Sequence, residues 1–332
     1  MITALRVYET ENTVPYENLA VEEYLLRHVA PGTCILYLWR NQRTVVIGRN
    51  QNAWSECKTA RLEADGGHLV RRLSGGGAVY HDLGNLNFTF LVRQDGYDVD
   101  RQLSVILHAL RAFGMEGEKS GRNDITLGGC KFSGNAFYQT GACCYHHGTL
   151  LVDVDMSMLS HYLQVSQSKL ERKGVASVRA RVTNLTEHCP GLSVPALRRQ
   201  LADSFGAVYG LEPVPLMPRE LDWEEIRAGE RRFSSWAWNY GAKTQFAQEA
   251  SRRYGWGDLQ LRYTVRDGAL EQVRLYSDGM EADFLAALPG QLTGCRYDRA
   301  ALSARLEEAC PAGPLQRQIL ADLSDLLGAQ FE

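Results

Sequence analysis

Three consecutive glycines follow a pair of arginines in residues 71–82, which read RRLSGGGAVYHD. Glycine has no Cβ, so such a loop allows positive φ angles and close contact between a ligand and bare backbone. Successive N–H groups in this geometry can form an anion-binding nest, and the arginines add positive charge beside it. Residues 78–80 and 86–90 have the composition of buried strands, which would hold the loop on rigid structure. An anion site is therefore favoured over a flexible linker.

The sequence motifs and the net charge exclude several classes of binding site and of protein. The loop has neither the G-x-x-x-x-G-K-[ST] pattern of a P-loop nor a dinucleotide fingerprint that opens a helix. The net charge of the 332-residue chain is −3, which argues against bulk nucleic-acid binding. No apolar run is long enough to span a membrane, and the N-terminus lacks a signal-peptide pattern. Eight scattered cysteines without a CxxC pair are typical of reduced thiols in a cytoplasmic protein.

Hydrophobic periodicity predicts a mixed chain of strands and helices in two parts. Amphipathic helices are expected at 18–27, 53–65, 103–113 and 194–206. Strands at 34–39 and 44–48 are separated by a short polar turn and are expected to form a hairpin. After about residue 245 the pattern changes to two strands followed by helices. The predicted domains are therefore residues 1–245 and residues 246–332.

A second dense stretch, GRNDITLGGCKFSGNA, covers residues 121–136. Gly128 and Gly129 predict a hairpin turn between two short strands. Lys131 follows this turn and is succeeded by small residues at 133, 134 and 136. A lysine on an edge strand normally points to solvent. The small residues allow a ligand to approach the backbone closely, and they favour a Lys131 side chain that points into a pocket.

Two other stretches are less decisive. His146 and His147 are adjacent on a predicted strand, so their side chains should point to opposite faces and make a poor pair of zinc ligands. Residues 169–185 are basic and contain a glycine. They are interpreted either as a solvated charge run or as a loop that closes over an anionic intermediate, and the residues alone do not decide between these.

Five stretches, taken in order, resemble the lipoate–protein ligase A family: residues 71–82, 121–124, 131–136, 147–151 and 173–185. The likeness covers most of residues 1–245, and the remainder resembles the small C-terminal accessory domain of that family. The resemblance implies an α/β (α+β) fold of the biotin/lipoate-ligase type, with a mixed β-sheet and flanking helices. It implies that ATP and magnesium activate free lipoate to lipoyl-AMP with release of pyrophosphate. The lipoyl group would then pass to a lysine of an acceptor protein.

The same resemblance implies roles for particular residues. Lys131 is implied as the active-site lysine that contacts both lipoate and the nucleotide, where its charge would offset repulsion between a carboxylate and a phosphate. Asp124 lies in a segment typical of the family and is our candidate for holding magnesium. The remaining implied residues are Arg72, Gly77, Ala78, Val79 and Tyr80 for ATP, Gly75, Gly76 and Ser133 for lipoate, and Lys173, Gly174, Val175, Ser177 and Arg181 for an adenylate-binding loop.

The implied partners are lipoyl-acceptor proteins, namely the glycine cleavage H protein or the lipoyl domains of 2-oxoacid dehydrogenase E2 subunits, and the chain is expected to act as a monomer. The main alternative keeps the fold and changes the reaction to an ATP-independent octanoyl or lipoyl transfer through a cysteine. Cys130, Cys143 and Cys144 lie near the predicted site segments. A protein that binds lipoate without ligating it is disfavoured by the intact glycine loop and by Lys131.

Overall fold

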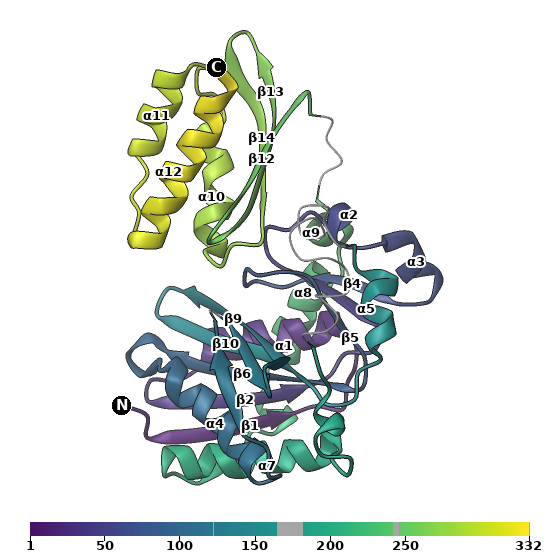
Figure 1. Ribbon diagram of the computed structural model, residues 1–332. Helices are drawn as coiled ribbons and strands as arrows, with labels where there is room; N and C mark the ends of the chain where they lie inside the picture. Colours follow the sequence, from purple (N-terminus) through teal and green to yellow (C-terminus); the bar gives the residue numbers. More distant parts are fainter. Residues whose placement is uncertain (122, 165–181, 242–245, 332) are drawn as a thin grey trace. The chain divides into compact units, whose positions relative to one another are not determined.

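The computed structural model describes residues 1–121, 123–164, 182–241 and 246–331, which form two compact units (Figure 1). Unit 1 comprises Met1–Val46, Trp54–Arg71 and Val79–Asn239. Unit 2 comprises Ile47–Ala53, Arg72–Ala78 and Tyr240–Glu332. The glycine-rich loop thus clusters with the C-terminal part of the chain. The boundary predicted at residue 245 lies outside the described residues.

Unit 1 is built on a mixed sheet of eight strands in the order β11-β1-β2-β6-β10-β9-β8-β7. The pairs β11–β1 and β1–β2 are parallel, and the remaining pairs are antiparallel. The sheet and its flanking helices confirm the predicted fold class. The strands are β1 (Ala4–Glu9), β2 (Thr33–Trp39), β6 (Asn85–Arg93), β7 (Gly117–Ser120), β8 (Asp124–Leu127), β9 (Cys130–Thr140), β10 (Cys143–Leu151) and β11 (Pro213–Pro215).

One face of this sheet is apolar and packs against α4 (Val99–Arg111) and α7 (Val194–Tyr209). The strands contribute Leu36, Phe88 and Phe90, all of them fully buried. Both helices begin at capping side chains, because Asp98 and Ser193 accept hydrogen bonds from backbone N–H groups of the first turn. This face forms the main hydrophobic core of unit 1.

The opposite face is unusually polar for a buried sheet surface. The register places Tyr37, Thr89 and His147 side by side across β2, β6 and β10. Helix α1 (Pro15–His28) packs on this face and contacts β2, β6 and β10, and helix α8 (Trp223–Phe233) packs against α1 (Figure 1). Buried polar side chains need hydrogen-bond partners, so this face is the place to look for a site. We call it the polar face.

The predicted hairpin between residues 34–39 and 44–48 is wrong. Strand β2 joins the large sheet between β1 and β6, whereas β3 (Thr44–Ile47) belongs to a separate sheet of order β4-β3-β5. Both strands are almost continuously buried, and each finds distant partners instead of the other. The short polar turn between two strands therefore does not predict that they pair with each other here. The other strands of the small sheet are β4 (His68–Arg71) and β5 (Val79–His81).

Smaller differences have simple causes. The helix expected at 53–65 is divided into α2 (Ala53–Glu56) and α3 (Thr59–Ala64). The sequence pattern does not predict strand β7, because its exposed Glu118 and Lys119 give no apolar signal at this sheet edge. The remaining elements of unit 1 are α5 (Met156–Tyr162), α9 (Trp236–Asn239), and the short helical turns Gln94–Gly96, Leu185–Glu187 and Pro218–Glu220.

The C-terminal part of unit 2 is a small α+β fold with its own core, as expected, but it has three strands where the sequence predicted two. Three antiparallel strands, β12 (Gln248–Tyr254), β13 (Gly257–Arg266) and β14 (Ala269–Ser277), form its sheet. Its helices are α10 (Ala282–Leu292), α11 (Arg299–Glu307) and α12 (Pro314–Gly328), with a final turn at Ala329–Phe331 (Figure 1). Among the described residues of the whole chain, no helix is long and apolar enough to cross a membrane.

Candidate functional site

Lys131 and Asp124 face each other across the hairpin of β8 and β9. The two strands are joined at Gly128 and Gly129, whose φ angles of 57° and 79° are those of a tight hairpin turn and confirm the predicted turn. The Lys131 ammonium lies 2.6 Å from Asp124 Oδ1, and the two side chains are 36% and 37% exposed. The pair is therefore accessible to a ligand from solvent.

A register shift in this hairpin determines where Lys131 points. The pairing of β8 with β9 slips between Ile125 and Thr126, and Phe132 packs into the apolar core. The Lys131 Nζ atom lies 3.1 Å from the position that a Cβ on residue 134 would occupy. Glycine at position 134 thus leaves the space in which the ammonium lies. A β-bulge is a common way to redirect a side chain next to a functional site.

Beside this pair, the polar face carries a chain of buried hydrogen bonds. Glu22 Oε1 lies 2.8 Å from the Nδ1 atom of His147 and accepts a hydrogen bond of 2.7 Å from the Thr89 hydroxyl. The Trp39 indole N–H donates to the same hydroxyl at 3.1 Å. His147 contacts Glu22 here, whereas His146 lies in the apolar core, so the two histidines do point to opposite faces as predicted.

The sequence patterns do not single out Glu22, Trp39 or Thr89 as site residues. One feature of α1 could have indicated them. Asn18 and Glu22 are one helical turn apart, and both lie among the apolar residues on the buried side of this helix. Asn18 extends the polar network, because its amide accepts from the Tyr37 hydroxyl at 3.2 Å and donates to the Asn41 side chain at 3.0 Å. Polar residues on the side of a helix that faces a sheet indicate that the sheet surface beneath them is polar as well.

Ser133 lies on the other face of the sheet from the Lys131 ammonium. It is fully buried, and the Asn135 side chain donates to its hydroxyl at 3.4 Å. Asn135 also contacts the Nε2 atom of His146 at 2.8 Å, deep in the core, where burial lowers the pKa of His146 to about 3. Asn123 and Asn135 exchange backbone and side-chain hydrogen bonds, which fixes the start of β8 next to Asp124.

The arginines of the glycine-rich loop bind backbone carbonyl groups. The Arg72 guanidinium donates to the carbonyl oxygens of Gly75 and Gly77 at 2.7 and 2.8 Å. Arg71 donates to the carbonyl of Asn239 at 2.6 Å. Of the three glycines only Gly76 has a positive φ, of 91°. The Arg72 guanidinium thus holds the backbone of the loop itself, whereas the Arg71 guanidinium holds the end of β4 against α9.

Two close backbone approaches within unit 2 require glycine. A Cβ on Gly75 would lie 2.1 Å from the carbonyl oxygen of Gly279, and a Cβ on Gly48 would lie 2.2 Å from that of Gly76. The residues of this loop region predicted to bind ATP are divided between the units, because Arg72, Gly77 and Ala78 belong to unit 2 whereas Val79 and Tyr80 belong to β5 of unit 1. Gly75 and Gly76, which were predicted for lipoate, belong to unit 2. Burial raises the pKa of Tyr80 to about 12, so its hydroxyl stays protonated.

The predicted adenylate-loop residues, Lys173, Gly174, Val175, Ser177 and Arg181, lie outside the described residues. The described chain resumes at Val182, which bridges to Lys131, and the Thr183 N–H donates to the Lys131 carbonyl at 2.9 Å. The described end of the predicted stretch 173–185 is therefore anchored directly at the candidate catalytic lysine.

The three cysteines considered for the alternative reaction differ in their exposure to solvent. Cys144 is fully buried, and burial raises the pKa of its thiol to about 11, which disfavours a thiolate nucleophile. Cys143 is also buried, whereas Cys130 is partly exposed beside Lys131. All eight cysteines belong to the described residues and are free thiols.

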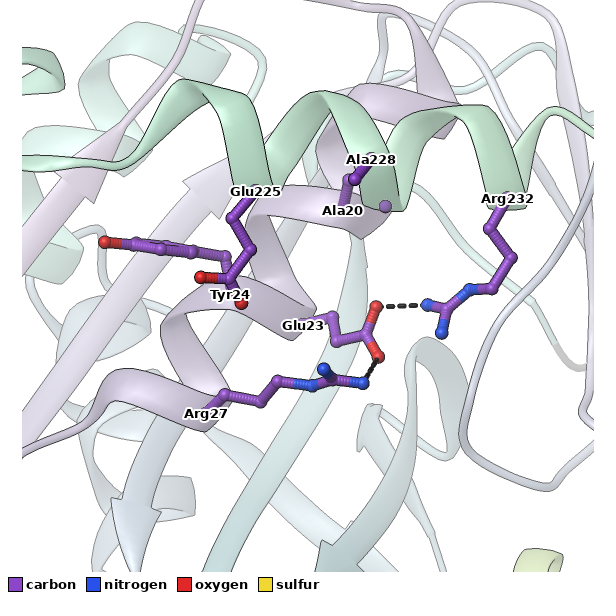
Figure 2. Close-up of a pocket in the computed structure, with 8 residues that line it drawn as sticks. Ala20, Glu23, Tyr24, Arg27, Glu225, Ala228 and Arg232 are labelled. Carbon is purple, nitrogen blue, oxygen red and sulfur yellow. Dashed lines mark hydrogen bonds and ion pairs between the residues drawn. The ribbon is translucent and has the colours of Figure 1, made fainter.

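A separate pocket of about 220 Å³ lies between α1 and α8 (Figure 2). Its central carboxylate, Glu23, pairs with Arg27 at 2.5 Å and with Arg232, so the buried charge is already balanced (Figure 2). None of the predicted site residues lines this pocket. We therefore locate the candidate site at Lys131 and Asp124 on the polar face. Within the described residues, no cluster of three or more His, Cys, Asp or Glu side chains could hold a metal.

Two family models match the chain. Residues 14–206 match the lipoyl protein ligase A/B catalytic domain, and residues 243–327 match the bacterial lipoate protein ligase C-terminus.

Solved structures with similar folds bind the ligands that the sequence had suggested. P. falciparum LipL1 in complex with lipoate is 26% identical, with a TM-score of 0.87 over 98% of this chain and 100% of that chain. A lipoate-protein ligase A bound with ATP is 29% identical, with a TM-score of 0.61 over 73% of this chain and 99% of that chain. A bipartite lipoate protein ligase of Thermoplasma acidophilum, studied with its E2 lipoyl domain, is 28% identical, with a TM-score of 0.63 over 75% and 100% of the two chains.

Proposed function

This chain belongs to the lipoyl protein ligase A/B family, and from that premise we propose that it is an ATP-dependent lipoate–protein ligase. In the first step a carboxylate oxygen of lipoate attacks the α-phosphorus of ATP, and the bond to the leaving pyrophosphate breaks. In the second step the amine of an acceptor lysine attacks the acyl carbon, AMP leaves, and the amine loses a proton. The product is a lipoyl amide on the acceptor.

The Lys131–Asp124 pair is the observation that carries this proposal. Two anions, a carboxylate and a phosphate, must approach each other in the first step, and an ammonium between them lowers the repulsion. Lys131 is partly exposed and lies over Gly134, with its backbone held by Thr183. It is thus a positioned cation and need not act as a nucleophile. Asp124 orients the ammonium until the anionic substrates compete for it.

Magnesium enters this scheme as part of the ATP substrate. Mg²⁺ in nucleotide sites is commonly held by one or two carboxylates together with phosphate oxygens. Asp124 offers one carboxylate of this kind, and its pairing with Lys131, the proposed phosphate-binding cation, supports a role beside the phosphates. A single protein carboxylate would be enough for a magnesium ion whose other ligands are phosphate oxygens of ATP and water molecules.

The remaining assignments stay proposals of the same kind. Arg72, Gly77, Ala78, Val79 and Tyr80 would contact ATP, Gly75 and Gly76 would contact lipoate, and residues 173–185 would cover the adenylate. Ser133 would support the lipoate site only through the backbone of β9, because its side chain lies on the other face of the sheet. We propose lipoyl domains of E2 subunits or the H protein as acceptors, a monomeric enzyme, and a cytoplasmic location, in keeping with eight free thiols.

Mass spectrometry of the products tests this function. The protein is incubated with lipoate, MgATP and an unlipoylated E2 lipoyl domain, and we expect lipoyl-AMP without the acceptor and a lipoyl mass increase with it. A Cys130→Ala variant should keep this activity. Transfer from an octanoyl-loaded H protein without ATP, lost in Cys130→Ala, would instead support the cysteine-dependent acyltransferase.

A further inference from the structure

Two asparagines in the middle of the large sheet have unsatisfied amide atoms. Asn85 and Asn87 lie on the same face of β6 and are 0% and 2% exposed. The Asn85 amide donates to Asn87 Oδ1 at 2.9 Å. In the described part of the chain, Asn87 Nδ2 and Asn85 Oδ1 have no hydrogen-bond partner. Exchanging the O and N atoms of both amides still leaves one donor and one acceptor unpaired.

Asparagine is an unfavourable choice at these positions for a purely structural purpose. It is depleted in strands, and an unpaired buried amide lowers the stability of the folded state. The alternate residues of the same strand, Leu86 and Phe88, are fully buried and apolar. An apolar side chain at position 87 would fill the same kind of space without the unpaired group. Unsatisfied polar groups in a native core indicate a ligand or another polar partner.

The register places Asn87 in one row with the candidate site. Asn87 lies opposite Trp39 of β2 on one side and opposite Thr149 of β10 on the other. The Thr149 hydroxyl accepts a hydrogen bond of 3.2 Å from the Gly134 N–H, and Gly134 is the residue over which the Lys131 ammonium lies. From β9 to β6 this row crosses two strand spacings, or about 10 Å.

We propose that Asn87 is a specificity-determining residue that donates a hydrogen bond to the sulfur-bearing end of the acyl substrate. This inference rests on the proposed function, in which Lys131 holds the substrate carboxylate. An extended medium-length acyl chain that starts at Lys131 and follows the row reaches Asn87 with its far end. Thioether and disulfide sulfur are weak acceptors and would use the free N–H. An alkanoate of equal length leaves this donor unpaired, and buried unpaired donors discriminate against such analogues.

The test measures the release of pyrophosphate from MgATP that depends on added lipoate or on added octanoate, which has no sulfur. For Asn87→Leu we expect kcat/KM for lipoate to fall about 3- to 10-fold relative to kcat/KM for octanoate. The melting temperature should change little, because the substitution removes the unpaired Asn87 Nδ2 atom but also removes the Asn87 Oδ1 acceptor of the Asn85 amide.

Gln102→Leu is the matched control. It also replaces a buried amide that has an unpaired Nε2 atom in the described structure, but it contacts His146 on the apolar face. Its ratio of kcat/KM for lipoate to kcat/KM for octanoate should equal that of the unmodified protein. An unchanged ratio in Asn87→Leu, or an equal loss for both acids with a lower melting temperature, would overturn the inference. If the unmodified protein releases no pyrophosphate with either acid, the proposed function itself fails.

Discussion

At the scale of single residues, the position of the Lys131 ammonium depends on the absence of a side chain at position 134. In Gly134→Ala the new Cβ would lie 3.1 Å from Lys131 Nζ and 3.2 Å from its Cε atom, so the ammonium must move. We expect kcat/KM for adenylate formation to fall about 10-fold or more, because small displacements of a positioned group are costly. The melting temperature should change little, because the φ of Gly134 is not positive.

Gly191→Ala serves as the control for this substitution, since its Cβ would meet no atom of the described residues within 4 Å. Steady-state kinetics and thermal unfolding of both variants make the comparison. Equal activity of Gly134→Ala and the unmodified protein would mean that Lys131 does not act from this position.

His146 gives unit 1 a stability that depends on pH. Burial holds its folded-state pKa at about 3, below the usual value of about 6.5, so the unfolded chain binds a proton more readily. The stability it contributes is complete above pH 6.5 and is lost as pH falls from 6.5 towards 3. Between pH 7 and pH 5 this amounts to about 2 kcal/mol of unfolding free energy.

Urea unfolding of the unmodified protein and of His146→Phe at these two pH values measures that contribution. The variant should be less stable at pH 7, because it loses the contacts with Gln102 and Asn135, but should lose about 2 kcal/mol less on acidification. Identical pH dependence in both proteins would show that His146 is not buried in its neutral form.

At the scale of elements, the sequence predicted best where one local pattern decides the structure. The clear apolar stripe of α4 predicted this helix over 103–113, although it begins at Val99 after the Asp98 cap, and the hairpin at Gly128 and Gly129 is set by its own turn residues. The hairpin expected between β2 and β3 failed because pairing in a sheet is decided by distant partners. The polar face was missed for the same reason, since it exists only once β2, β6 and β10 are side by side.

The close backbone contacts of the glycine-rich loop also belong to this scale. Gly75→Ala would place a Cβ 2.1 Å from the Gly279 carbonyl oxygen, and a backbone atom cannot rotate away as a side chain can. We expect a loss of about 1–3 kcal/mol in unfolding free energy, the usual cost of overpacking. Gly77→Ala is the control, because no described atom lies within 4 Å of its Cβ position and its φ is not positive.

Chemical denaturation of these two variants distinguishes a packing role from a purely functional one. If Gly75→Ala and Gly77→Ala are equally stable, the contact between the loop and Gly279 contributes nothing to the fold.

At the scale of the whole molecule, the domain division is only partly visible in the sequence. The change of pattern near residue 245 correctly indicates a C-terminal α+β unit. That unit also takes in Ile47–Ala53 and Arg72–Ala78, two segments that the linear pattern assigns to the first domain. The Ser277 N–H donates to the Asn50 carbonyl, and the Asn50 side chain donates to the Ala282 carbonyl. Such contacts join segments more than two hundred residues apart and leave no local signal.

The central claim is that Lys131 provides the positioned cation for ATP-dependent activation of lipoate. The most direct test measures pyrophosphate release from MgATP, with and without lipoate and without any acceptor protein, for the unmodified protein and Lys131→Ala. We predict release only when lipoate is present, and a loss of about 100-fold or more in Lys131→Ala at an unchanged melting temperature. Full lipoate-dependent release by a stably folded Lys131→Ala variant would contradict the claim.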